Sequence, residues 1–214
     1  MEDEPVHGLT TAPAEWADVE SLFSLPGEPS RCWCRYFALT GPEYSALEPA
    51  ARKAQLREKF DAGSTAPGVL AFRAGRPVGW CAVEPRTCYP RVLRSRVLRL
   101  ADASAPADAG ADAVATDPAP RDVWSVTCFV VAPGHRRSGV ADALLGAAVD
   151  HARIHGADVV EGYPVDRGLR PKASAADLYH GTLNLFLRAG FQAVSSAVPG
   201  RAVVRLDLRG GPAN

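Results

Sequence analysis

The feature that most constrains the fold is a strand-like segment that runs into an amphipathic helix and then into a second strand. In "DVWSVTCFVVAP" (122–133), alternate positions share one face: Val123, Ser125, Thr127, Phe129 and Val131. From about Gly139 to His155, apolar residues recur at helical spacing. "ADVVEGYPV" (157–165) reads as the next strand, parallel to the first if the helix is a crossover connection. The order predicts an α/β fold around a parallel strand pair.

The remaining pattern predicts a single domain over residues 1–214. Helical spacing is found over 13–25 and 45–63, and "RCWCRYFAL" (31–39) reads as a short strand. A β-hairpin is expected over 68–84, a short helix over 182–190, and a closing hairpin over 191–209. The stretch 101–120 consists almost entirely of small residues, Asp and Pro, so we expect a surface loop there.

Composition excludes several classes of function. The 24 Lys and Arg residues equal the 24 Asp and Glu residues, and this zero net charge argues against a nucleic-acid or membrane-surface binder. No apolar run approaches the roughly 20 residues of a membrane span. The acidic start lacks the layout of a secretory signal, so we expect a cytoplasmic protein with five reduced cysteines. The basic run Arg91, Arg94, Arg96 and Arg99 makes no helical stripe and is interpreted as a solvated segment.

The turn between the first strand and the helix has the chemistry of an anion site. Its pattern is Arg136-x-x-Gly139-x-Ala141. The first turn of a helix carries N–H groups without partners, and the helix dipole adds positive charge to them. Glycine permits close approach of a ligand, and arginines add donors. The pattern favours a diphosphate, and a plain helix start with two solvated arginines stays open as the alternative.

The order of elements and the stretch "VVAPGHRRSGVADALL" resemble the GCN5-related N-acetyltransferase (GNAT) family over about Val69 to Leu208. The resemblance implies a mixed, mostly antiparallel sheet with a central splayed parallel strand pair flanked by helices. It implies acetyl-CoA as cofactor, with the pyrophosphate held at the turn and the pantetheine arm paired with the first strand. The residues so implied are Phe129, Val130, Val131, Arg136, Arg137, Ser138, Gly139, Val140 and Ala141. "CWC", "GWCAVEPR" and "VEGYPVD" look like a bacterial subgroup of the family.

Acetyl transfer to an amine needs a group that accepts the amine proton and one that protonates the leaving thiolate. Glu84 and Glu161 qualify as bases by their strand positions, with ion pairing to an arginine as the alternative for each. The family's usual tyrosine is replaced by Phe186 in "LFLRAGF", a side chain that can pack on pantetheine but cannot donate a proton. Tyr163 and Tyr179 are possible substitutes.

The expected activity is transfer of an acetyl group to a primary amine, by direct attack in a ternary complex. The substrate is expected to be a small molecule. Trp33 and Trp80 are candidate walls of its pocket, with core packing as the alternative. The cysteines and histidines show no metal-ligand spacing, so we expect no metal. A protein N-terminus or lysine as acceptor, a non-catalytic CoA sensor, and a homodimer stay open.

Overall fold

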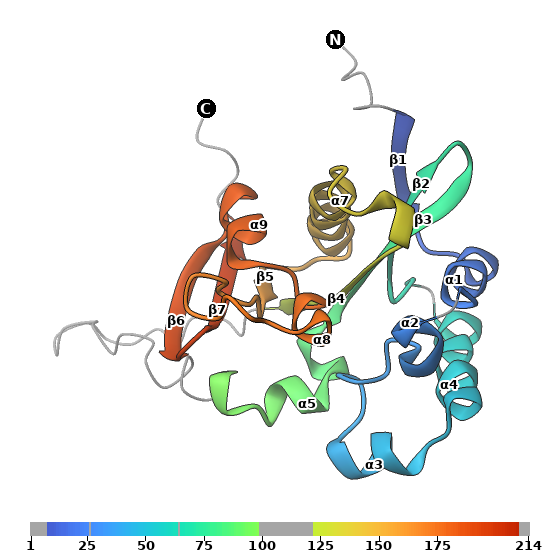
Figure 1. Cartoon of the computed structure of the whole chain (residues 1–214), viewed down its shortest axis with the longest axis horizontal. Helices are drawn as coiled ribbons and strands as arrows, with labels where there is room; N and C mark the ends of the chain where they lie inside the picture. Colours follow the sequence, from blue (N-terminus) through green and yellow to red (C-terminus); the bar gives the residue numbers. More distant parts are fainter. Residues whose placement is uncertain (1–7, 26, 64, 99–121, 210–214) are drawn as a thin grey trace, which may run out of the picture.

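Seven strands form one mixed sheet in the computed structural model, which describes residues 8–25, 27–63, 65–98 and 122–209 (Figure 1). The strand order is β1-β2-β3-β4-β5-β7-β6, with β4 and β5 parallel and the other neighbours antiparallel. The strands are β1 (Leu9–Pro13), β2 (Gly68–Arg73), β3 (Arg76–Pro85), β4 (Val123–Val131), β5 (Val159–Gly162), β6 (Gln192–Val198) and β7 (Arg201–Asp207). The predicted α/β class, the mixed sheet and its parallel pair are confirmed.

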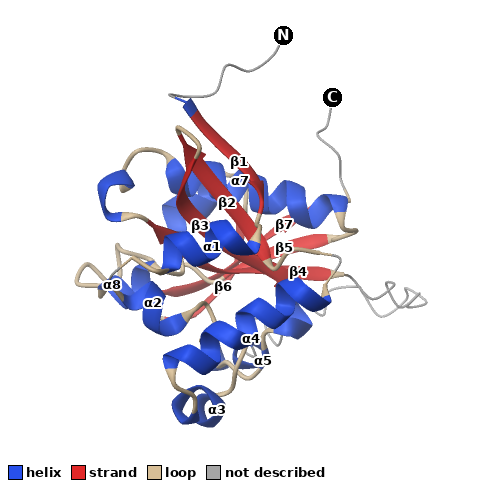
Figure 2. Ribbon diagram, turned by 90° about the vertical axis from the view of Figure 1, so that its right-hand side faces the viewer, coloured by secondary structure: helices blue, strands red, loops and turns tan. Residues whose placement is uncertain are grey.

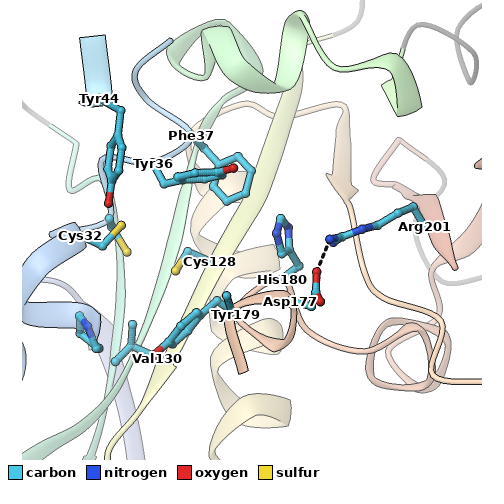
Figure 3. A pocket seen from close by; sticks show the side chains of 13 residues that line it. Cys32, Tyr36, Phe37, Tyr44, Cys128, Val130, Asp177, Tyr179, His180 and Arg201 are labelled. Carbon is cyan, nitrogen blue, oxygen red and sulfur yellow. Dashed lines mark hydrogen bonds and ion pairs between the residues drawn. The ribbon is translucent and has the colours of Figure 1, made fainter. Parts of the chain in front are cut away.

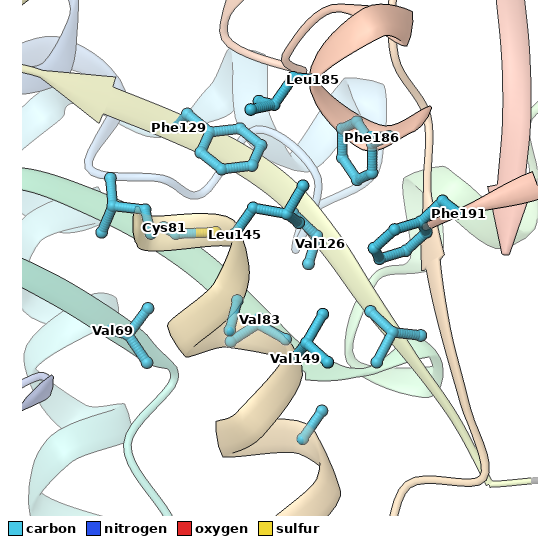
Figure 4. Close-up of a cluster of buried hydrophobic side chains, with 14 of the residues drawn as sticks. Val69, Cys81, Val83, Val126, Phe129, Leu145, Val149, Leu185, Phe186 and Phe191 are labelled. Carbon is cyan, nitrogen blue, oxygen red and sulfur yellow. The ribbon is translucent and has the colours of Figure 1, made fainter. Parts of the chain in front are cut away.

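Helices cover both faces of this sheet (Figures 1 and 2). The crossover helix α7 (Val140–Ile154) and α9 (Leu183–Arg188) pack on one face, where their apolar side chains meet β2 to β5 and β7 in the largest buried cluster (Figure 4). The opposite face is covered by the N-terminal helices and by α5. These are α1 (Trp16–Phe23), α2 (Glu28–Cys32), α3 (Gly41–Ala46), α4 (Pro49–Ala62), the 3-10 turn η2 (Arg86–Cys88) and α5 (Pro90–Leu93).

The parallel pair separates partway along β4. Its register runs from Val123 opposite Val159 to Val126 opposite Gly162 and stops there, although β4 continues to Val131. On its other edge, β4 has a bulge against β3, because Ala82 faces Cys128 while Val83 faces Val126. The extra residue reverses the alternation beyond it. The prediction that Ser125 and Phe129 share a face is therefore wrong, since Phe129 packs in the α7-side cluster with Trp124 and Val126.

One local prediction for the N-terminal half is also wrong, and one strand there was not predicted. Residues 31–39 form no strand: α2 ends at Cys32, and Trp33 and Cys34 both adopt left-handed backbone angles, with φ 48° and 49°. The outer edge of β2 pairs with β1, an exposed five-residue strand that the pattern did not indicate. The aromatic residues of 31–39 serve turns and helix packing instead. The predicted loop 101–120 lies outside the described residues.

Glycine at position 79 lets α7 approach the sheet closely. A Cβ atom at Gly79 would lie 2.6 Å from Cγ1 of the buried Val140 and 2.9 Å from Cδ1 of Leu144. Both side chains belong to the first turns of α7, so this contact fixes where the helix begins relative to β3 and β4.

We predict that Gly79→Ala lowers the free energy of unfolding by about 1–3 kcal/mol, because the added methyl group overpacks a rigid contact. Chemical denaturation monitored by circular dichroism measures the change. Gly146→Ala is the matched control, since Gly146 lies on the exposed side of α7 with open space at its Cβ position. The control should retain or slightly raise stability, and equal losses in both variants would contradict the packing argument.

Candidate active site

Two adjoining cavities lie on the side of the sheet opposite α7, where β4 and β5 have separated. The aromatic cavity has a volume of about 300 Å³, and Cys128 and Val130 of β4 form part of its wall. Tyr36, Phe37, Tyr44 and Tyr179 supply most of the remaining apolar surface, and Cys32 and Cys34 line it beside them. Figure 3 shows a polar group of three residues, Asp177, His180 and Arg201, on the side of the cavity away from Tyr44.

The second, basic cavity has a volume of about 520 Å³ and is lined by Arg91, Arg94 and Arg201. Within the described residues no Asp or Glu lines it. Four residues line both cavities, so the two spaces adjoin: Tyr36, Phe37, His180 and Arg201.

The imidazole of His180, which lines the aromatic cavity, is neutral at physiological pH. Burial lowers the pKa of this imidazole to about 4, and the positive charge of Arg201 adds to the effect. The ring lies edge-on to Phe37 with 4.8 Å between centroids, and its Nδ1 has no hydrogen-bond partner among the described residues. Asp177 is held by Arg201 and by Arg170, whose Nη1 lies 3.6 Å from its Oδ1.

The turn before α7 has the geometry that an anion requires. Arg137 and Gly139 both have left-handed backbone angles, φ 59° and 79°. The hydrogen bonds of α7 begin with the amide of Ala143, which donates to the carbonyl oxygen of Gly139. The amide groups preceding Ala143 are therefore not consumed by the helix ladder. A Cβ atom at Gly139 would meet nothing within 4 Å, so the space above the turn is open to a ligand. The turn fits the predicted diphosphate.

The separated part of β4 presents backbone groups toward the gap. The Phe129 amide points away from β3, because it donates a 2.7 Å hydrogen bond to the carbonyl oxygen of Tyr179. Alternate residues of a strand direct their backbone groups to the same side, so Val131 also faces the gap, while Val130 faces β3. Hydrogen bonding of a pantetheine arm to the backbone of Phe129 and Val131, on the edge of β4 that faces away from β3, thus remains a prediction. The amide of Phe129 already donates to Tyr179 in this structure.

The carboxylate of Glu161 lies in a buried polar cluster and lines neither cavity. The side chain is fully buried and accepts hydrogen bonds from Nε of Arg205 (2.6 Å), from Nη1 of Arg86 (3.4 Å) and from the hydroxyl of Tyr163 (2.5 Å). The Tyr163 hydroxyl also lies 2.8 Å from Oγ of Ser125. Burial, reinforced by the nearby Glu161, raises the pKa of Tyr163 well above its usual value, so this hydroxyl stays protonated.

The other predicted site residues are engaged elsewhere. Glu84 shares a face with Trp80, as expected, but forms an ion pair with Lys59 of α4 at 2.6 Å. Trp80 is fully buried, with Nε1 directed at the sulfur of Cys34, and Trp33 stacks on Trp16; neither lines a cavity. Phe186 is also fully buried, against Gly162 and edge-on to Phe129. Core packing, the alternative given for Trp33 and Trp80, describes both side chains. Glu84 forms an ion pair as its alternative expected, but with a lysine and not an arginine. The expected contact of Phe186 with pantetheine stays a prediction.

Sequence reasoning missed most of the cavity wall. Tyr36, Phe37 and Tyr44 follow the Cys-x-Cys stretch closely, and this aromatic density was the available signal. The sequence around Asp177 and Arg201 does not indicate a site, because these two residues meet only through the fold.

The five cysteines form no disulfide, and burial raises the pKa of Cys34 and Cys81 well above the usual range. The described residues contain no cluster of metal-ligating side chains. No helix among them is long and apolar enough to cross a membrane.

A parallel strand pair that separates at its carboxyl ends, followed by an anion-attracting turn and a helix, is the arrangement of acyl-CoA-dependent transferases of the N-acetyltransferase fold. Residues 33–166, more than half of the chain, match the model of the acetyltransferase (GNAT) family. The chain belongs to this family. It is an acetyltransferase, and so an acyltransferase.

Solved structures with the same fold span nearly the whole chain. One is the acetyltransferase yncA of Salmonella typhimurium with its cofactor acetyl-CoA, at 14% identity and TM-score 0.52, covering 96% of this chain and 97% of that one. Another is a GCN5-related N-acetyltransferase of Kribbella flavida, at 18% identity and TM-score 0.52, covering 94% and 98%. A third is the ribosomal-protein-alanine N-acetyltransferase of Brucella melitensis, at 15% and 0.51, covering 93% and 99%. A comparison with curated protein sequences gives no match.

We predict that replacing both Arg136 and Arg137 by alanine weakens CoA binding by about tenfold or more, since each removes a charge-assisted contact to phosphate. Isothermal titration calorimetry with CoA measures this affinity. Arg153→Ala, at the opposite end of α7, is the control and should bind CoA like the wild type. An unchanged affinity in the double variant would refute the phosphate site.

We predict that Glu161→Gln destabilises the fold by about 3 kcal/mol, because Arg86 and Arg205 would lose the buried charge that balances theirs. Denaturant unfolding measures this loss, and kcat is compared at a temperature where both proteins are folded. Glu58→Gln, on the exposed side of α4, is the control and should change neither quantity. A large drop in kcat with unchanged stability would instead support Glu161 as the base.

Proposed function

We propose that this acetyltransferase acetylates the primary amine of a small molecule by direct attack in a ternary complex. The observation that carries the proposal is the aromatic cavity against the separated part of β4. Its four aromatic side chains and its volume of about 300 Å³ suit a compact apolar or aromatic body. The absence of disulfides fits a reducing compartment, and we propose a cytoplasmic location.

A peptide acceptor is less well supported by the walls of the site. A peptide amine would be expected to meet an open groove with acidic side chains. Asp177 is the acidic residue of the aromatic cavity within the described part of the chain, and two arginines already balance it. Fold similarity to a ribosomal-protein-alanine N-acetyltransferase, at 15% identity, does not transfer that acceptor to this chain.

The acyl donor and the protein make different contributions to the proposed reaction. When bound, acetyl-CoA supplies the acetyl group as a reactive thioester. The protein orients the two reactants and excludes water, which accounts for much of the acceleration in such transfers. Backbone amides directed into the gap beside β4 can stabilise negative charge on an attacked carbonyl oxygen. The hydrogen bond from Phe129 to Tyr179 then has to open before that amide can serve.

Among the described residues that line the aromatic cavity, no strong base is available to remove a proton from the acceptor. His180 is the neutral imidazole on the cavity wall, and a group with a pKa of about 4 accepts a proton from an ammonium ion very poorly. An ammonium ion would also have to shed water next to Arg201 without a free carboxylate to receive it. We propose that the amine enters the cavity already deprotonated.

The expected result is a kcat/KM that rises with pH at a slope of one in logarithmic units until the pKa of the acceptor amine. Thiol release from acetyl-CoA, with the acetylated product verified by mass spectrometry, measures this over a panel of primary arylalkyl amines of different pKa. The inflection of the pH profile should shift with the pKa of the amine, and His180→Gln should leave it unchanged. A fixed inflection between pH 6 and 7 for every amine would point to an enzyme base, and release with peptides alone would overturn the small-molecule proposal.

A further inference from the structure

The basic cavity adjoins the aromatic cavity but has the opposite chemical character. Three guanidinium groups line it, contributed by α5, by the residue that follows α5 and by the start of β7. Tyr163, directly beyond β5, lines it as well, so this cavity also lies at the open end of the strand pair. His180 adds no charge near neutral pH, because its pKa is about 4. The described residues that line the cavity therefore carry a net positive charge, within a chain whose formal net charge is zero.

The contacts of these arginines do not fully neutralise their positive charge. Arg201 pairs with Asp177, but Arg170 shares the same carboxylate, so two cations meet one anion. Arg91 donates from Nε to the carbonyl oxygens of Tyr36 and Leu39, at 2.5 and 3.2 Å, and lies 4.0 Å above the Tyr36 ring. All of these Arg91 partners are neutral.

The third arginine, Arg94, is exposed at the mouth of the cavity. Glu43 is an acid that interacts with Arg94 by charge, but it does not line the cavity. The Glu43 carboxylate accepts 2.7 Å hydrogen bonds from the amide and the hydroxyl of Thr40 at the start of α3, and these bonds lower its pKa. Glu43 stays charged and attracts Arg94, but its carboxylate is bound within a helix cap outside the cavity. Within the described residues, the three guanidinium groups therefore face the cavity without a carboxylate in its lining.

We propose that the basic cavity binds an anionic group of the acceptor, a carboxylate or a phosphate. The acceptor is then an amine with an apolar or aromatic body and an anionic tail. Its body lies between the rings of the aromatic cavity and its tail reaches the arginines past Phe37 and His180, which line both spaces. This inference rests on the proposed function, because it assumes that the aromatic cavity holds the amine.

Binding of the anion is tested without turnover. Benzoate, inorganic phosphate and neutral benzamide are titrated into ¹⁵N-labelled full-length protein, and the amide signals of Thr40, Gly41 and Ser95 around the basic cavity are followed. We expect the two anions, but not benzamide, to shift these signals. The anion that binds more tightly identifies the tail as a carboxylate or a phosphate.

Arg94→Gln should weaken anion binding by about tenfold, as expected for the loss of one charge-assisted hydrogen bond. Arg96→Gln is the matched control, because Arg96 is exposed on the same segment and lines neither cavity. The control should stay within twofold of the wild type. Equal weakening in both variants, or no shift of the three amides, would overturn the proposal.

An activity comparison separates this inference from the proposed function. Thiol release is measured with 2-phenylethylamine and with 4-(2-aminoethyl)benzoate, which differ by one carboxylate. We expect a higher kcat/KM for the carboxylate-bearing amine, and a loss of about tenfold in that preference in Arg94→Gln. Equal rates for both amines would overturn the anion subsite and leave the proposed function standing. Anion binding without acetylation of any amine would overturn the proposed function instead.

Discussion

The separation of β4 from β5 is the constraint on which the site depends. Parallel strands normally satisfy each other's backbone groups along their whole length, but here the pairing stops at Val126 and Gly162. The groups beyond that point need another partner, and in this structure the carbonyl of Tyr179 takes one of them. The same separation opens the sheet opposite α7, so the aromatic and basic cavities both lie at its end. Close packing of α7 over Gly79 then fixes the position of the turn before α7, next to the end of β4.

A buried polar cluster holds the strands together just before they part. Ser125 of β4 lies directly opposite Glu161 of β5 in the register, and Tyr163 bridges the two through its hydroxyl. Arg205 of β7 and Arg86 of η2 bind the same carboxylate from the other sides. An unpaired carboxylate at this depth would be very costly, whereas a fully paired one fixes the relative positions of four elements. This explains an acidic residue in a central strand without assigning it a proton transfer.

The long, strongly patterned elements were predictable from the sequence. The β4–α7–β5 unit, the hairpin of β2 and β3 and the family resemblance all rest on local periodicity and on one six-residue turn. The failures were of two kinds. A single bulge reversed the facing of β4 beyond Val126, and period-two reasoning cannot locate a bulge. The polar residues of the aromatic cavity come from separate segments after β5, and local patterns do not indicate which distant segments will meet.

The positive charge of the basic cavity could not be predicted from the amino-acid composition. Equal numbers of acidic and basic residues argue against a surface that attracts polyanions, but they do not describe the inside of a cavity. Arg91 and Arg94 were interpreted as part of a solvated segment, yet α5 and the residue after it place them on a cavity wall with Arg201, which is more than one hundred residues away in the chain. Cations gathered in a concave wall reinforce one another's field, because the low-dielectric protein between them screens little. The same field that favours an anionic tail disfavours an ammonium ion nearby. A neutral amine attached to an anionic group is therefore the acceptor whose charges agree with both cavities at once.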